Sequence, residues 1–104
     1  MDYKIIFSEP AIDDLQTIVR FIARDNQPAA ARFGEKLIGS IRHLARFPRI
    51  GRVVPEQNDA NIREIISKPY RVFYRVKDEA RVIEVIRFWH AARGEPKIPR
   101  DLEF

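Results

Sequence analysis

The apolar residues near the N-terminus follow first the spacing of a strand and then that of a helix. Residues 3–7 are aromatic and β-branched, which predicts a short strand. Ser8-Glu9-Pro10 then has the features of a helix start: a hydroxyl cap, a first-turn acid, and a proline whose missing N–H costs nothing there. We predict that this helix ends near Asp25. Its buried face is predicted from apolar residues at helical spacing, Ile12, Leu15, Val19 and Ile22.

A second helix is predicted directly after the first. Asn26 can cap it, and Pro28 fits in its first turn. The helix should run to about Phe47-Pro48. Its apolar stripe consists of Ala30, Phe33, Leu37, Ile41 and Leu44. Because the connection is short, the two helices should form an antiparallel hairpin.

The C-terminal half has strand patterns. Residues 47–61 are rich in Pro, Gly, Asn and Asp and predict a loop, and residues 61–67 predict a short strand. Residues 70–78 alternate, which places Arg71, Phe73 and Arg75 on one face of a strand. A tight turn at Asp78-Glu79 should join this strand to residues 80–90, ARVIEVIRFWH, which are apolar on both faces and therefore expected to be central in the sheet.

These elements predict an α+β fold with the order β-α-α-β-β-β. The helical hairpin should cover one face of a small, mainly antiparallel sheet, and the other face should be open and carry arginines. A chain of 104 residues is long enough for one domain. We assign the domain to residues 1–93. Residues 94–104, with two prolines and no periodicity, should form an extended C-terminal arm.

Composition narrows the class of protein. Cysteine is absent, which excludes disulfides and thiolate sites. No apolar run has the length of a membrane span, and the N-terminus does not resemble a signal peptide, so a cytoplasmic location is expected. The net charge is +4, and 14 of the 19 basic residues are Arg. Arginine binds phosphate or carboxylate with a planar fork, although an Arg-rich surface can also be simply solvated.

Three features are candidates for chemistry. Arg71 and Arg75 share one face of a strand, and Arg63 of the preceding strand could join them to hold phosphates or carboxylates of a partner. His90 ends the last strand, where it is either a general acid or base or a capping and packing histidine. Glu56, in the long loop, is either a base beside the arginines or a solvated side chain. The spacing of the two histidines gives no metal motif, and we expect neither a metal nor a cofactor.

Across about residues 3–93 the sequence resembles the RelE/ParE superfamily of bacterial type II toxins. The resemblance is carried by the order and spacing of several segments: YKIIFSEPAIDDLQTIVRFIA, HLARFPRIGRVVPE, IREI, YRVFYRV and VIEVIRFWHAARGEP. It implies a toxin held inactive by a cognate antitoxin in a hetero-oligomer, with no membrane partner. RelE-like members cut messenger RNA in the ribosomal A site. ParE-like members inhibit DNA gyrase and are not known to need a catalytic site.

The resemblance also implies site residues. In a RelE-like nuclease, the catalytic residues would be His90, Arg71 and Glu56. The loop lacks the lysine cluster of several such nucleases, and no tyrosine follows His90, so the ParE-like branch is favoured. A degenerate module that only binds its partner is a further alternative. The set expected to contact the target is Arg63, Arg71, Arg75, Arg87, Trp89, His90 and Arg93.

Overall fold

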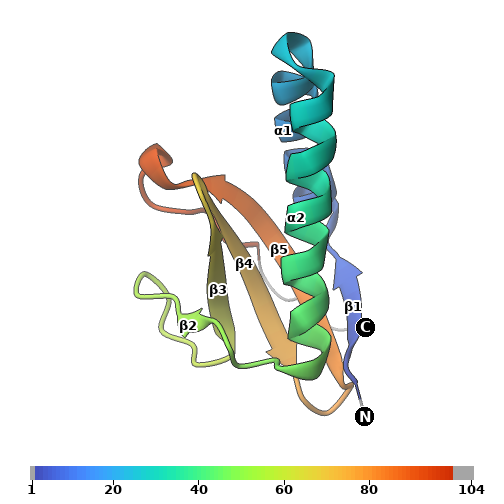
Figure 1. Ribbon diagram of the computed structural model, residues 1–104. Helices are drawn as coiled ribbons and strands as arrows, with labels where there is room; N and C mark the ends of the chain where they lie inside the picture. Colours follow the sequence, from blue (N-terminus) through green and yellow to red (C-terminus); the bar gives the residue numbers. More distant parts are fainter. Residues whose placement is uncertain (1, 100–104) are drawn as a thin grey trace.

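The structure is a computed structural model in which residues 2–99 are described. It has the predicted α+β architecture, with one short strand, β2, in the segment predicted to be a loop. The elements in chain order are β1 (Lys4–Phe7), α1 (Glu9–Asp25), α2 (Gln27–Arg46), β2 (Arg52–Val53), β3 (Ile62–Ser67), β4 (Tyr70–Lys77), β5 (Val82–His90) and a 3-10 helix, η1 (Ala91–Arg93) (Figure 1). Neither helix in the described part of the chain is long and apolar enough to cross a membrane.

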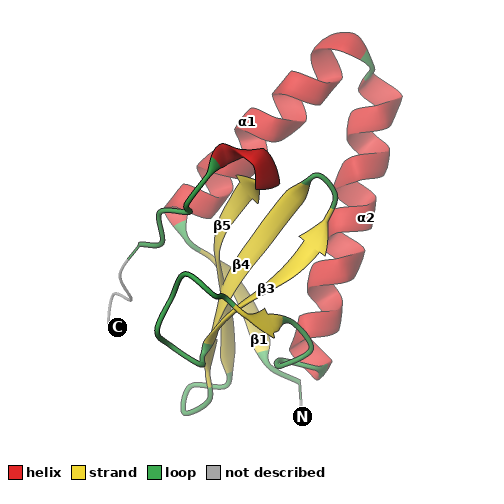
Figure 2. Ribbon diagram, turned by 90° about the vertical axis from the view of Figure 1, so that its left-hand side faces the viewer, coloured by secondary structure: helices red, strands yellow, loops and turns green. Residues whose placement is uncertain are grey.

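The five strands form one sheet in the order β1-β5-β4-β3-β2. β1 runs parallel to β5, and the other neighbouring pairs are antiparallel. β5 therefore has a neighbour on each side, as its two apolar faces predicted, while β4 holds the middle position. α1 and α2 form an antiparallel hairpin that lies across one face of the sheet, and its tip extends beyond the sheet (Figures 1 and 2).

Both predicted helix caps are present. The hydroxyl of Ser8 accepts a hydrogen bond from the Ala11 amide at 3.1 Å and donates one to the carbonyl of Ile86 at 3.0 Å. Asn26 Oδ1 accepts from the Ala29 amide at 3.0 Å. The prediction that Ile12 is buried is wrong, because its side chain is 43% exposed. Ser8 bonds to β5, and the face of α1 that packs on the core consists of the buried Ala11 and Ile18 with the partly buried Leu15 and Ile22.

The sheet has a core on each face. Towards the hairpin, the apolar cluster includes Leu37, Ile41, Val72, Val85 and Phe88. On the opposite face, a second buried cluster consists of Val54, Ile62, Phe73, Ile86 and Trp89, with Ile98 packed against it. The prediction that this second face is open is therefore wrong. Val54 from the loop after β2 and Ile98 from the C-terminal segment cover it.

The C-terminal segment explains part of this cover. Residues 94–99 have no regular secondary structure, as predicted for an arm, but they pack back onto the sheet through Ile98. They lie on the side of the sheet opposite the hairpin (Figure 2). The remainder of the predicted arm, residues 100–104, lies outside the described residues.

Candidate functional site

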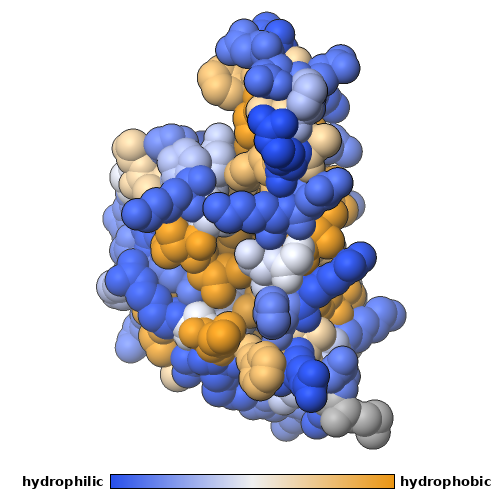
Figure 3. Space-filling model, in the orientation of Figure 1, coloured by the Kyte–Doolittle hydropathy of each residue, from blue (hydrophilic) through white to orange (hydrophobic). Residues whose placement is uncertain are grey.

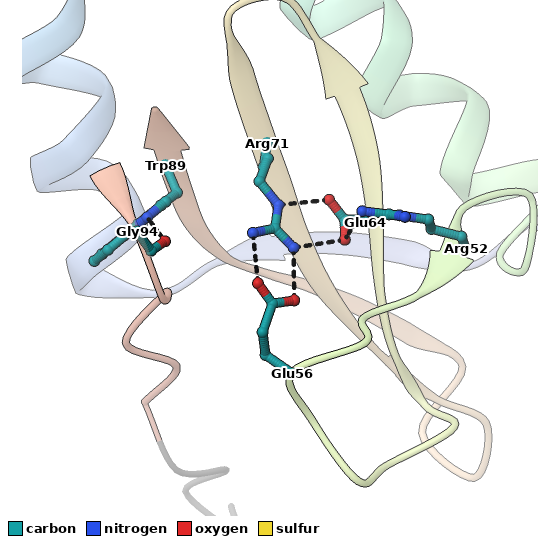
Figure 4. A network of polar contacts seen from close by, with 6 residues as sticks. All are labelled: Arg52, Glu56, Glu64, Arg71, Trp89 and Gly94. Atoms are coloured by element: carbon teal, nitrogen blue, oxygen red, sulfur yellow. Dashed lines mark hydrogen bonds and ion pairs between the residues drawn. The ribbon is translucent and has the colours of Figure 1, made fainter. Parts of the chain in front are cut away.

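Arg71 lies at the centre of a polar network on the sheet face opposite the hairpin (Figure 4). Its Nε and Nη2 donate to the carboxylate of Glu64 at 2.7 and 2.8 Å. Its Nη1 and Nη2 donate to the carboxylate of Glu56 at 2.8 and 2.9 Å. The guanidinium also lies 4.7 Å from the centre of the Phe73 ring. Arg71 is only 8% exposed, so it does not present a free cation to a partner.

Glu64 binds a second cation at the rim of this network. Arg52 Nη2 lies 3.2 Å from Glu64 Oε2, and its side chain is largely exposed. The hydrogen bonds that Arg71 donates to Glu64 and Glu56 raise the pKa of Arg71 further above its already high value. The hydrogen bonds from Arg71 lower the pKa of Glu56. Glu56 is therefore a carboxylate held in its charged form, which makes it a weak base.

The depressed pKa of Glu56 gives a pH-dependent prediction. Glu56→Gln should lower the free energy of unfolding by about 1 kcal/mol at pH 7, because its side chain is 27% exposed and the ion pair is partly screened. A carboxylate with a lowered folded-state pKa stabilises above its unfolded value and loses this effect as pH falls through the folded value. The difference between wild type and variant should therefore shrink below the ordinary glutamate pKa of 4.5. Chemical denaturation of both proteins at pH 7 and pH 3 measures this difference in free energy of unfolding. A difference that does not change with pH would contradict the prediction.

Arg75 and Arg87 are also engaged inside the protein. Arg75 Nη1 donates to Glu84 at 2.8 Å, and its Nη2 donates to the carbonyl of Pro99 at 3.0 Å. Arg87 donates to both carboxylate oxygens of Asp14, at 2.7 and 2.9 Å, and to the carbonyl of Lys97 at 3.2 Å. These two arginines fasten residues 94–99 to the sheet, and they are not an open phosphate-binding surface.

Arg63 does not join the other arginines, contrary to the sequence prediction. It pairs across from Tyr74 in the β3–β4 ladder, and Tyr74 packs in the core beneath the hairpin. Its Nη1 donates to the carbonyls of Gly51 and Arg49 at 2.9 and 3.3 Å. The reason is the strict alternation of a strand, which places Ile62 and Glu64 on the same face as Arg71 and turns Arg63 to the other face.

Trp89 is a buried stacking platform. It is 2% exposed, and its Nε1 donates to the carbonyl of Gly94 at 3.1 Å. The guanidinium groups of Arg93 and Arg87 lie 3.9 and 5.0 Å from the centre of its ring. Trp89 therefore orients the side chain of Arg93, and Arg93 remains exposed. Trp89 itself is buried and does not reach a partner.

His90 is exposed at the end of β5 and lies on the hairpin side of the sheet. Its ring meets the edge of Tyr70 at 5.3 Å between centroids, and Tyr70 meets Phe33 of α2 at 5.5 Å. His90 Nδ1 accepts a hydrogen bond from the Ala92 amide at 3.0 Å and so caps η1. In the neutral ring, the proton is therefore on Nε2, which is a donor. Of the two roles that the sequence allowed for His90, these contacts are those of a capping and packing histidine.

A hollow of about 330 Å³ opens beside His90, between α1 and the end of β5. The polar groups around it come from α1, β4, β5 and η1, and its apolar lining includes Ile18 and Phe88. Its lining residues are Asp13, Asp14, Thr17, Ile18, Tyr70, Arg87, Phe88, His90 and Arg93. Of the seven residues expected to contact a target, His90 and Arg93 are the exposed ones at this hollow.

The structure thus brings Arg71 and Glu56 together but separates them from His90. Trp89 pairs with Arg71, and His90 pairs with Tyr70, so successive side chains of β5 point to opposite faces. Sequence reasoning missed Glu64 and Asp14, the carboxylates that bind Arg71 and Arg87. A charged residue among the apolar positions of a short strand was the signal for Glu64. The described residues contain no group of three or more His, Asp or Glu side chains that could hold a metal ion.

Comparison with known proteins agrees with the resemblance found in the sequence. Residues 5–94 match the family described as ParE toxin of type II toxin-antitoxin system, parDE. Toxin RelE2 of Caulobacter vibrioides is 30% identical over 91 residues, which cover 86% of this chain and 97% of that protein.

Solved structures share the fold. The chromosomal ParDE toxin–antitoxin system from P. aeruginosa has a TM-score of 0.67 at 16% identity, covering 85% of this chain and 95% of the other. The toxin–antitoxin complex RelBE2 from Mycobacterium tuberculosis has a TM-score of 0.60 at 24% identity, covering 86% and 99%. At these identities the two structures support the fold alone, while the family match spans most of the chain. The chain therefore belongs to the RelE/ParE superfamily of toxins of type II toxin–antitoxin systems.

Proposed function

We propose that this protein acts by binding its target without cleaving RNA, through ParE-like inhibition of DNA gyrase, and that a cognate antitoxin neutralises it. The observation that carries the proposal is the position of His90. Its side chain packs with Tyr70 on the hairpin side of the sheet, whereas Arg71 and Glu56 lie on the other side. The match of residues 5–94 to the ParE toxin family supports the same choice of target.

Cleavage of RNA by the set His90, Arg71 and Glu56 would require the acid, the base and the cation within hydrogen-bond reach of one scissile phosphate. Here Glu56 and Glu64 hold the guanidinium of Arg71, and Arg71 keeps Glu56 charged. His90 has its Nδ1 engaged by the Ala92 amide. These groups are arranged as structural ion pairs and a cap. Binding of a target needs no such constellation and is compatible with all of these contacts.

The surface that we propose for the target is the rim of the hollow beside His90. Arg93 is exposed there and rests on the Trp89 ring, which reduces the freedom it would lose on binding. His90 presents its Nε2–H as a further donor, and Asp13 and Thr17 of α1 line the same hollow. This proposal replaces the broader arginine surface of the sequence analysis, because Arg71 and Arg75 are bound internally.

A RelE-like messenger-RNA nuclease is the second candidate. The relative that favours it is toxin RelE2, which is 30% identical to this chain. Arg71, Glu56 and the exposed Arg52 do lie close together, so a loop movement that releases Glu56 would free cations on this face. That movement would still leave His90 on the opposite side of the sheet. A degenerate module, which binds the antitoxin without toxicity, is the third.

The proposed antitoxin partner is supported by the solved structures of similar fold. The M. tuberculosis RelBE2 structure and the E. coli RelBE structure are both toxin–antitoxin complexes. We propose that this chain likewise forms a hetero-oligomer with an antitoxin that folds on binding and buries apolar surface of the hairpin and of the sheet edge.

Variants at the hollow separate the two target classes in cells. Expression without antitoxin should arrest growth, and His90→Gln should retain this toxicity because glutamine keeps hydrogen-bonding capacity. Arg93→Glu should weaken target binding by about tenfold or more, equivalent to about 1.4 kcal/mol, because it reverses a charge at the proposed contact. Growth after induction, with expression and folding checked for each variant, measures whether His90→Gln keeps toxicity and whether Arg93→Glu reduces it.

The matched control for Arg93→Glu is Arg32→Glu on the exposed part of α2, away from the hollow. It should leave toxicity unchanged. Loss of toxicity in a folded His90→Gln protein would favour the nuclease instead. Absence of any growth effect from folded wild type would leave only the degenerate module.

A further inference from the structure

Residues 46–53, which connect α2 to the sheet, repeat an arginine followed by an apolar residue every three positions. The pairs are Arg46-Phe47, Arg49-Ile50 and Arg52-Val53, which we call the Arg–apolar stripe. Its apolar side chains are 50%, 64% and 41% exposed, in that order. Single exposed apolar residues are ordinary, whereas apolar side chains that gather on one part of the surface, rimmed by polar groups, are typical of an interaction site.

The stripe is held in place by bonds to the sheet. The Gly51 amide donates to the hydroxyl of Tyr74 at 3.0 Å, and Arg63 donates to the Gly51 carbonyl at 2.9 Å. A Cβ at Gly51 would lie 2.4 Å from the carbonyl oxygen of Glu64, so the chain passes directly against β3 and requires glycine there. Arg49 adds a bidentate contact to Asp78. A partner would therefore meet a fixed surface, which lowers the entropic cost of binding.

The stripe also contains a hollow that can receive a side chain. A hollow of about 380 Å³ is lined by Arg46, Phe47, Pro48, Arg49 and Ile50. Hydrophobic groups reach the surface among hydrophilic ones in the region where α2 ends and the chain continues to β2 (Figure 3). This hollow lies on segments different from those at His90, so it is a second surface, separate from the proposed target contact.

The charges around the stripe indicate the chemistry of its partner. Arg49 already pairs with Asp78, and Arg52 with Glu64, whereas Arg46 rests over the Phe47 ring. Nucleic acid is disfavoured, because two of the three guanidinium groups are engaged and only one of the three apolar side chains, Phe47, is aromatic and could stack with a base. A second copy of this chain would bring the same arginines into opposition. A protein segment with an apolar side chain beside an acidic one fits both the hollow and Arg46.

We propose that the Arg–apolar stripe is a docking site for an acidic segment of the antitoxin. An apolar side chain of that segment would occupy the hollow between Phe47 and Ile50, and a neighbouring carboxylate would pair with Arg46. This inference rests on the proposed function, because it requires a cognate antitoxin. It concerns a surface separate from the hollow beside His90 that we propose for the target. A segment that wraps around the protein can reach both the end of α2 and the edge strand β2.

Calorimetric titration of this protein with its cognate antitoxin tests the inference. The double variant Phe47→Ser/Ile50→Ser and the single variant Arg46→Glu should each bind the antitoxin about 10- to 100-fold more weakly, as expected for loss of an apolar anchor or reversal of a contact charge. The defect of Arg46→Glu should shrink at high salt, whereas that of the double variant should persist, because apolar burial is not screened.

The control is Ile66→Ser, which removes an apolar side chain that is 54% exposed on β3. It should bind like wild type. Unchanged affinity of both stripe variants would overturn the inference and leave the proposed function standing. Failure of wild type to bind any antitoxin would contradict both. All variants should retain the target inhibition of wild type, which also shows that they are folded, and loss of that inhibition would contradict the separation of the two surfaces.

Discussion

Glu64→Ala should lower the free energy of unfolding by about 3 kcal/mol or more, a large part of the stability of a domain of this size. Glu64 is 1% exposed and accepts two hydrogen bonds from Arg71. Its removal leaves the buried guanidinium with Glu56 as its remaining carboxylate partner among the described residues. Breaking one side of a buried pair is costly because the other charge stays largely out of water with only part of its compensation left, here the partly exposed rim carboxylate of Glu56.

The double variant Glu64→Leu/Arg71→Met provides the control. It removes both charges and replaces them with apolar side chains of similar size, so much of the lost stability should return. Urea denaturation gives the free energy of unfolding of the three proteins, which can be compared if its dependence on urea concentration is the same for all of them. A loss below about 1 kcal/mol for Glu64→Ala, which is typical of an exposed ion pair, would contradict the buried network.

A stop after Arg93 should lower the free energy of unfolding by about 3 kcal/mol. It removes Ile98 from the cluster around Phe73 and Trp89, where burial of one such side chain contributes up to about 2 kcal/mol. It also removes the carbonyls of Gly94, Lys97 and Pro99, which accept from Trp89, Arg87 and Arg75. Each of these hydrogen bonds contributes on the order of 1 kcal/mol.

A stop after Pro99 is the matched comparison, because it keeps every one of these contacts. The protein that ends at Arg93 should be about 3 kcal/mol less stable than the protein that ends at Pro99. Urea denaturation of the two truncated proteins gives the comparison. If the protein that ends at Arg93 is less stable and also less toxic, its lower stability accounts for at least part of the lost toxicity. The loss is then not evidence that residues 94–99 contact the target. Equal stability of both truncated proteins would show that residues 94–99 contribute nothing to the fold.

Local signals in the sequence were sufficient for the elements of the fold. Ser8 and Asn26 cap their helices as predicted, and the apolar stripe of the second helix is buried, because caps and helical periodicity depend on near neighbours. The alternation of residues 70–78 correctly placed Arg71 and Phe73 on one face. The two-residue strand β2 was missed, since its pattern is too short to differ from a loop.

Contacts between distant segments account for the errors at the site. The arginine face looked open because nothing local showed that Glu56 and residues 94–99 return to cover it. The acid that binds Arg87 is Asp14, which lies 73 positions away in the sequence, so no local pattern links the two side chains. His90 and Arg71 were grouped as one catalytic set, although register in the β4–β5 pair places them on opposite faces.

The most direct test of the central claim uses purified protein in two parallel assays. Gyrase supercoiling and ribosome-dependent cleavage of messenger RNA are measured with wild type and with His90→Gln at equal concentrations. We predict that both proteins inhibit supercoiling and that neither cleaves RNA, because His90 caps η1 on the side of the sheet away from Arg71. Messenger-RNA cleavage in the A site by wild type that His90→Gln abolishes, with supercoiling unaffected, would contradict the account.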